Sequence, residues 1–325
     1  MSADVAFREA AAADRDAILA LRAIAFPDDD REKRRSQFWE WEFRRGYAGP
    51  ARVYVAENGD RIVGHFAFVP QRYHFAGNIE GALAVDVMGD PQFRRQKIFS
   101  RLSSFAAHDL RKHVRLVTAL QIREEVMGGM EAGGWRAVNE LPVLLKPVSL
   151  RRIAQDLLKV RSRLPAAEVR AFTATARFED VDSLLATDAP RQPRTVDFLA
   201  WRYTQNPEWR YSIDGRYEAG RLRAFLIQRD TVLRGMRTMA IADAGGDVPA
   251  IGALVSQASA TCHERGVGLA AALISKVHPA YHALRRCGFI RGPHRFNLLL
   301  QVFDPSLDSL MREPWSLSWG DTDHL

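Results

Sequence analysis

The protein is a chain of 325 residues, of which 47% are hydrophobic and 10% aromatic. This composition argues against a disordered chain, and the length exceeds the usual size of one hydrophobic core, so two domains are expected. The formal net charge of +7 is spread along the sequence, which disfavours nucleic-acid binding and fits equally well an anionic small molecule such as a phosphorylated cofactor.

The N-terminus and the cysteines indicate the compartment. The first residues lack a basic region followed by an apolar run, and no segment reaches the roughly 18 uninterrupted apolar residues of a membrane helix. Cys262 and Cys287 have neither the spacing of a disulfide framework nor that of a zinc site. We therefore expect a soluble, cytoplasmic protein with no metal and no membrane partner.

The first half alternates strand and helix patterns. Residues 14–26 and 36–44 have helical spacing, and the aromatic side chains of the second segment favour core packing. Two β-rich runs flank Asn58-Gly59 and predict a hairpin. The predicted strands are 5–8, 52–57, 61–69, 81–88, 114–120 and 135–146, and the further helices are 98–113 and 124–132.

The stretch from Val85 to Leu102 combines a short apolar strand, a turn at Pro91, a basic loop and the first turn of an amphipathic helix. Such an arrangement brings several backbone N–H groups and the positive end of the helix dipole to one point, which suits a phosphate or pyrophosphate. The alternative is an ordinary strand-to-helix turn with a solvated basic patch.

The second half repeats the first. Phe198-Leu-Ala-Trp-Arg-Tyr203 has the aromatic spacing of Phe38-Trp-Glu-Trp-Glu-Phe43, and Cys287-Gly-Phe289 takes the place of Gly133-Gly-Trp135. A repeat of about 90 residues is too long for a solenoid unit and indicates two copies of one domain. We therefore predict domains at 1–150 and 168–303, a linker at 151–167 and a tail at 304–325.

The second copy lacks the basic loop. Its counterpart, residues 242–249, has glycines but no basic residue, so we expect this copy to serve the architecture, or to wall a substrate site, without binding a pyrophosphate. Residues 315–325 of the tail carry two tryptophans and two acids, whereas termini are usually loose and polar. We expect the tail to dock near the groove between the domains.

Residues 91–99 resemble the pyrophosphate loop of the GNAT superfamily of N-acyltransferases, in which a Pro-x-aromatic-Arg-x-x-Gly-x-Gly/Ala segment follows a strand. Gly134-Trp135 resembles the Gly-Phe that closes the last helix of that family, and the order of elements in 5–147 and again in 168–303 is also similar. The resemblance implies an α/β (α+β) protein of two tandem GNAT-like domains, each a mixed, mostly antiparallel twisted sheet flanked by helices. It also implies acetyl-CoA or another acyl-CoA as co-substrate, and a monomer or homodimer.

The resemblance assigns the acyl-CoA contacts to the strand end and the loop. Backbone N–H groups of Val87, Met88 and Gly89 would polarise the thioester carbonyl, and Gly89 would allow the strand to bulge and open a slot for the pantetheine arm. The loop contacts would come from Arg94, Arg95, Gln96, Lys97, Ile98, Phe99 and Ser100.

Four positions depart from the family pattern. Lys97 replaces the first glycine of the loop, where glycine lets the backbone adopt unusual dihedral angles, and Phe99 replaces the second small residue. Met130, and Leu284 in the second copy, stand where the family has its usual tyrosine general acid.

Acyl transfer to an amine needs a base near the slot. Asp86, on the same strand, is the candidate catalytic residue, and a structural bond to a neighbouring loop is its alternative role. Asp90 is expected to cap the turn before Pro91.

Tyr73, Asp321 and Asp323 are the candidate substrate contacts. Tyr73, like His65 and His74, would border the acceptor site, although isolated side chains of this kind usually pack or face solvent. In some tandem relatives the C-terminus reaches the active site, so the acids of the tail would bind or deprotonate an amine. Alternatively, the aromatic tail only seals the groove between the domains and does not contact the substrate.

The sequence thus favours an acyl-CoA-dependent N-acyltransferase acting on a small-molecule amine, such as an amino sugar or an amino-acid derivative. Two alternatives stay open. One is a catalytically silent tandem GNAT protein that binds a ligand or partner, which Lys97 and Met130 motivate. The other is an aminoacyl-transfer enzyme that uses charged tRNA, for which the basic pI of about 9.7 is the only support.

Overall fold

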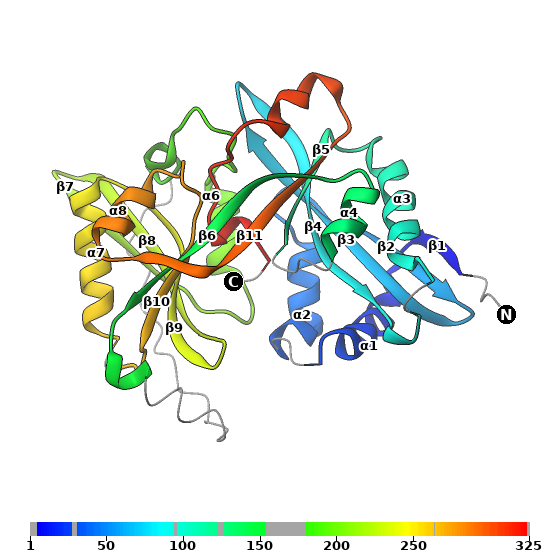
Figure 1. Ribbon diagram of the computed structural model, residues 1–325, viewed down its shortest axis with the longest axis horizontal. Helices are drawn as coiled ribbons and strands as arrows, with labels where there is room; N and C mark the ends of the chain where they lie inside the picture. The colour runs from blue at the N-terminus through cyan, green and yellow to red at the C-terminus, as the bar shows by residue number, and fades with distance from the viewer. Residues whose placement is uncertain are drawn as a thin grey trace. The chain divides into compact units, whose positions relative to one another are not determined.

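The computed structural model describes residues 5–27, 31–93, 96–121, 126–153, 180–262 and 264–323. The chain divides into two compact units (Figure 1). Unit 1 comprises Met1–Asn139, Gln205–Glu208 and Asn297–Glu313, and unit 2 comprises Glu140–Thr204, Trp209–Phe296 and Pro314–Leu325. The predicted linker at 151–167 lies, beyond residue 153, outside the described residues.

Unit 1 is a twisted sheet with helices on both faces. Its strands β1 to β5 are neighbours in chain order, and all pairs are antiparallel except β4 with β5, which are parallel. The strands are β1 (Ala6–Glu9), β2 (Arg52–Asn58), β3 (Arg61–His74), β4 (Asn78–Gly89) and β5 (Leu116–Gln121). The helices are α1 (Arg15–Ala25), α2 (Ser36–Trp39), which continues as the π-helical turn η3 (Glu40–Arg44), α3 (Ile98–Leu110) and α4 (Met127–Ala132).

The alternation of side chains along β3 separates the two faces. Phe66 and Phe68 point to the side of α3, where they share a buried core with Leu102. His65 points to the opposite side and meets the ring of Phe43 with centroids 6.1 Å apart. In Figure 1, α3 and α4 accordingly lie on one side of the strands, and α1 and α2 on the other.

From α6 onward, unit 2 repeats the order of elements from α2 to α4 around its own buried core. Its strands run in the order β10-β9-β8-β7, with β9 and β10 again the parallel pair. The elements are α6 (Val196–Leu199), continued by the π-helical turn η8 (Ala200–Thr204), then β7 (Ser212–Glu218), β8 (Arg221–Leu233), β9 (Met236–Gly246), α7 (Val248–Ala260), β10 (Leu269–Leu273) and α8 (Ala280–Arg286).

Local geometry confirms the repeat that the sequence predicts. Both aromatic segments form one α-helical turn followed by a π-helical turn. The helices α4 and α8 both end at a glycine with a left-handed backbone, Gly134 with φ of 89° and Gly288 with φ of 90°. A residue with a Cβ would be strained there, which explains why the two Gly-aromatic pairs match.

The last strand of each unit comes from the other half of the sequence. In unit 1, residues 297–302 of β11 (Ile290–Val302) pair antiparallel with β5. In unit 2, residues 143–147 of β6 (Arg136–Pro147) pair antiparallel with β10. The compact units therefore differ from the predicted domains 1–150 and 168–303, because each unit includes a strand from the other half of the sequence. The sequence pattern marks a strand but does not name its partner.

No helix within the described ranges is both long and apolar enough to cross a membrane.

Candidate active site

The strands β4 and β5 diverge after a short parallel contact. Only residues 81–83 of β4 pair with 116–118 of β5, although β4 continues to Gly89 and β5 to Gln121. The backbone groups of β4 beyond Leu83 therefore face a widening gap on this edge. The predicted slot for the pantetheine arm would lie at this gap.

A bulge lies in the diverging part of β4. The register with β3 shifts between His65 and Ala67, which pair with Met88 and Val85, so β4 has one residue more than its partner. Asp86, inside the bulge, has a left-handed φ of 50°. The expectation that Gly89 provides the bulge is wrong, because the extra residue lies at Asp86 and Val87.

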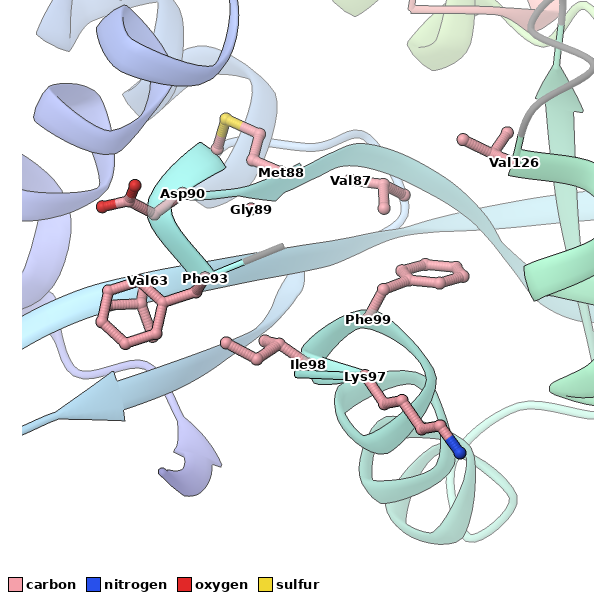
Figure 2. Close-up of a pocket in the computed structure, with 10 residues that line it drawn as sticks. All are labelled: Val63, Val87, Met88, Gly89, Asp90, Phe93, Lys97, Ile98, Phe99 and Val126. Carbon is pink, nitrogen blue, oxygen red and sulfur yellow. The ribbon is translucent and has the colours of Figure 1, made fainter. Parts of the chain in front are cut away.

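A cavity of about 360 Å³ lies between the end of β4 and the start of α3 (Figure 2). Val87 and Phe99 point toward each other across it, and Val126 approaches from the side (Figure 2). Its walls are mostly apolar: Val63, Val87, Met88, Gly89, Asp90, Phe93, Lys97, Ile98, Phe99 and Val126. Six predicted cofactor contacts, namely Val87, Met88, Gly89, Lys97, Ile98 and Phe99, thus meet at one place.

The N-terminus of α3 closes one end of the cavity. The first N–H groups of a helix have no partner within the helix, so those of Ile98, Phe99 and Ser100 are available to an anion. Ser100 Oγ donates to the carbonyl oxygen of Lys97 at 3.0 Å. Gln96 is exposed just before the helix, whereas Arg94 and Arg95 lie outside the described residues.

Lys97 has a left-handed backbone conformation, which glycine adopts more readily than other residues. Its φ of 55° and ψ of 26° are left-handed, at the residue that precedes the first turn of α3. The side chain is exposed and its ammonium is directed away from the space between Val87 and Phe99 (Figure 2). A lysine adopts this conformation only with backbone strain.

Asp90 fixes the turn that leads from β4 to α3. Its carboxylate accepts a hydrogen bond from the Gln92 N–H at 2.9 Å, which is the capping role that the sequence predicts. It also forms an ion pair with Arg61 of β3. The turn itself is the short helical segment η4 (Pro91–Phe93).

Asp86, the candidate base, is enclosed on the α1 side of the sheet. Its side chain is 8% exposed and forms an ion pair with Arg22 of α1, which is 3% exposed. The Asp86 carbonyl oxygen lies 2.7 Å from His65 Nδ1. Burial lowers the pKa of His65, and the nearby Asp86 carboxylate offsets this only in part.

Tyr73, Asp321 and Asp323 are not among the residues that line this cavity. Tyr73 is buried, and its hydroxyl bonds Thr118 Oγ1 at 2.7 Å. Asp321 belongs to unit 2, where it is buried against Arg194 with 2.7 Å between Asp321 Oδ1 and Arg194 Nη1. Asp323 also belongs to unit 2 and is half-buried. Substrate binding by these three residues stays a prediction.

In unit 2 the tail occupies the place that corresponds to the slot. Ser318 forms an antiparallel bridge with Ile274, directly after β10, and its hydroxyl bonds the Asp243 carboxylate on β9 at 2.8 Å. The Ser275 N–H donates to the Leu317 carbonyl oxygen at 2.9 Å. A segment bonded to both strands fills the gap between them.

A buried charge cluster holds that segment. Arg194 donates to both Asp243 and Asp321, with Nε 2.8 Å from Asp243 Oδ2. The Tyr203 hydroxyl also donates to Asp243 at 2.5 Å. Burial would raise the pKa of Asp243, but Arg194 and the hydroxyl donors hold it low, whereas burial and the charge of Asp243 raise the pKa of Asp321.

Sequence reasoning missed Arg22 and underrated His65. Arg22 lies four residues after Ile18 on the buried face of α1, and an arginine at an apolar position of a helix is a signal for a buried ion pair. The partner on β4 could not be read from the sequence, because α1 and β4 are far apart in the chain.

Within the described part of the chain, no group of three or more His, Cys, Asp or Glu side chains lies close enough together to hold a metal ion.

The comparisons with known proteins agree with this geometry. Residues 6–123 match the model of the acetyltransferase (GNAT) domain family. A search among curated proteins gave no match. The matched segment covers the divergent strands, the bulge and α3.

Solved structures of low sequence identity share the fold. A probable N-acyltransferase from Enterococcus faecalis V583 has a TM-score of 0.64 at 12% identity, covering 92% of this chain and 72% of that one. A GCN5-related N-acetyltransferase from Anabaena variabilis has a TM-score of 0.62 at 10% identity, with 92% and 73% covered. The N-myristoyltransferase of Saccharomyces cerevisiae, solved with bound myristoyl-CoA, has a TM-score of 0.62 at 10% identity, with 99% and 85% covered.

Proposed function

We propose that the protein is an acyl-CoA-dependent N-acyltransferase in which unit 1 binds the acyl donor and a small-molecule amine is the acceptor. The observation that carries the proposal is the cavity between the β4 bulge and the N-terminus of α3, inside the segment that matches the GNAT family. We further propose that the chain is a tandem GNAT protein whose second unit is not a donor site.

The residues present fit an acyl-CoA. The apolar wall of Val87, Phe99 and Val126 suits the pantetheine arm and the acyl group, which have little charge. The N-terminal N–H groups of α3 suit the pyrophosphate, because the helix dipole favours negative charge there. Backbone N–H groups at the bulge would stabilise the negative charge that develops on the thioester oxygen.

The proposed reaction is direct transfer. The amine nitrogen attacks the thioester carbonyl, a C–N bond forms, the C–S bond breaks, and the CoA thiolate leaves and takes up a proton. The amine must also lose one proton, and Asp86 is the candidate base from the sequence. Its ion pair with the Arg22 guanidinium reduces its basicity, so we favour loss of this proton to water.

Two measurements test the proposal together. Calorimetric titration with acetyl-CoA and CoA should show a single binding site per folded chain. Incubation with acetyl-CoA and a panel of amino sugars and amino-acid derivatives should release free thiol only when both substrates are present. Absence of binding at millimolar cofactor, with folding verified by circular dichroism, would exclude the donor site. Repeating the titration with longer acyl groups defines the acyl length.

A second candidate function is a catalytically silent ligand-binding protein. Met130, at the place of the tyrosine of the family, is buried in the core of unit 1, and Asp86 is ion-paired. Acyl-CoA binding without thiol release for any amine in the panel would favour this function over catalysis.

A further inference from the structure

The backbone of Asp86 is held in an unfavourable conformation. A left-handed φ is uncommon for residues other than glycine, and such residues persist only where their surroundings impose them. Two contacts on the α1 side of the sheet reach Asp86. The Arg22 guanidinium pairs with its carboxylate, and the His65 ring reaches its carbonyl oxygen.

The hydrogen bond to the Asp86 carbonyl oxygen defines the tautomer of His65. A carbonyl oxygen only accepts, so Nδ1 must carry the hydrogen at this distance of 2.7 Å. The other ring nitrogen, Nε2, is buried and has no hydrogen-bond partner among the described residues. Leaving a buried polar atom unpaired is costly, and a nonpolar ring at this position would avoid that cost.

The bond also orients the next peptide group. In a trans peptide the C=O of Asp86 and the N–H of Val87 point in opposite directions. Because His65 holds the C=O on the α1 side, the Val87 N–H points away from that side. Val87 lines the cavity on the α3 side, so the bond to His65 directs this N–H toward the proposed donor site.

Unit 2 offers a matched comparison within the same chain. Asp243 corresponds to Asp86 in the repeat and pairs with an arginine, Arg194. Phe225, opposite Gly245, takes the place of His65, which is opposite Met88. Asp243 does not have a positive φ. Both strands thus have a register shift, in β9 next to Asp243, but the aspartate has a positive φ only in unit 1, where the histidine is present.

We infer that His65 and Arg22 are positioning residues, which together hold Asp86 left-handed and so fix the bulge of β4 against the donor cavity. Asp86 is then a positioning residue as well, and its carboxylate serves Arg22 and not the acceptor amine. The catalytic consequence rests on the proposed function, whereas the conformational consequence does not.

The conformational part is tested without turnover. Nitrogen NMR of the imidazoles should show His65 as the neutral Nδ1–H tautomer, and His65 should be less protonated than an exposed histidine at the same pH, since burial lowers its pKa. Crystal structures should retain the positive φ of Asp86 in the wild type and in His65→Asn, whose amide N–H can replace Nδ1–H. The φ should become negative in His65→Phe, which copies Phe225. An Nε2–H tautomer, or an unchanged bulge in His65→Phe, would overturn the inference.

The catalytic part uses the same variants. We expect His65→Phe to lower kcat by about ten- to a hundredfold, with the KM for acyl-CoA changed less than about threefold, because the N–H contact matters most in the transition state. His65→Asn should recover most of kcat. Equal kcat in wild type and His65→Phe would contradict the positioning role.

Variants of Asp86 distinguish a positioning role from base catalysis. They also test the inference if His65→Phe does not fold. Asp86→Gly accepts a positive φ without strain, and Asp86→Asn still bonds Arg22, so both should keep more activity than Asp86→Ala. If Asp86 is instead the base, all three variants lose activity alike. If no amine is acylated by the wild type, the proposed function fails while the NMR and crystallographic results still decide the bulge.

Discussion

The two units differ at the gap between their parallel strands. In unit 1 the parallel strands β4 and β5 separate beside an apolar cavity, next to a strained bulge. In unit 2 the parallel strands β9 and β10 flank the tail, which Ser318 ties to both. A divergent pair of strands leaves backbone groups that need partners, and either a bound ligand or a segment of the chain can supply them.

The buried ion pairs also differ between the two units. Unit 2 places Arg194, Asp243 and Asp321 where the tail is held, all nearly inaccessible to water. In unit 1 the Arg22–Asp86 pair lies on the α1 side of β4, the Asp90–Arg61 pair lies at the turn after β4, and the cavity is mostly apolar. Two copies of one fold can therefore differ in whether the gap between the parallel strands lies beside a cavity or is filled by a segment of the chain.

The largest expected effect is the loss of stability when the buried charge cluster that holds the tail is broken. Arg194→Met leaves two buried carboxylates without their cation, so we expect the free energy of unfolding to fall by about 3–5 kcal/mol. Arg223→Met is the control, because its pairs with Glu218 and Asp247 are exposed and should contribute at most about 1 kcal/mol. Urea unfolding followed by tryptophan fluorescence measures both, and equal losses would contradict the role of the tail cluster.

Acid should weaken unit 2 through His278. Burial lowers the pKa of His278 to about 4, below its unfolded value of roughly 6.5, so the unfolded state takes up the proton first as the pH falls. This contribution to stability is complete above about pH 6.5 and is lost toward pH 4, which amounts to about 2 kcal/mol between pH 7 and pH 5.

Urea midpoints at pH 7 and pH 5 test this. His278→Asn can still accept the Ala280 N–H, which His278 Nδ1 accepts at 3.2 Å, but it does not titrate, so the loss should shrink. His282→Asn, at an exposed position of α8, should leave the pH dependence unchanged. A loss that is the same in both variants would assign the acid sensitivity to other groups.

Filling the cavity of unit 1 should remove donor binding. Val87→Trp places an indole between Val87 and Phe99, and we expect the affinity for CoA to fall at least about tenfold, or about 1.4 kcal/mol. Val232→Trp adds the same ring at an exposed position of unit 2 and should bind normally. Calorimetry compares the two variants. Normal CoA binding by Val87→Trp would mean that the donor does not bind in this cavity.

The smallest effect concerns the loop. Lys97→Gly removes both the ammonium and the strain, whereas Lys97→Ala removes the ammonium alone, so the glycine variant should be more stable by about 1 kcal/mol. Thermal unfolding measures this difference. Equal stability would mean that the left-handed φ of Lys97 costs nothing in the folded protein.

Much of the fold could be predicted because its signals are local. The hairpin at Asn58-Gly59, the helix after the basic loop and the aromatic repeat all depend on neighbouring residues. The exchange of β6 and β11 could not be predicted, since pairing of distant strands leaves no local pattern.

The site was predictable in part for the same reason. The predicted cofactor contacts near Val87 and Ile98 are close in the chain, and these residues line one cavity. The environment of Asp86 depends on α1 and β3, and the bonds of Asp321 depend on Arg194, which is 127 residues away. Tyr73 looked accessible because the sequence alone does not show that Thr118 lies against its hydroxyl.

A crystal structure of the protein with acetyl-CoA or CoA is the most direct test of the difference between the units. We expect electron density for the cofactor in unit 1 only, with the pantetheine arm beside Val87 and the pyrophosphate at the N-terminus of α3, and the tail still bonded between β9 and β10. Cofactor density in unit 2 in place of Ser318, or none beside β4, would contradict it.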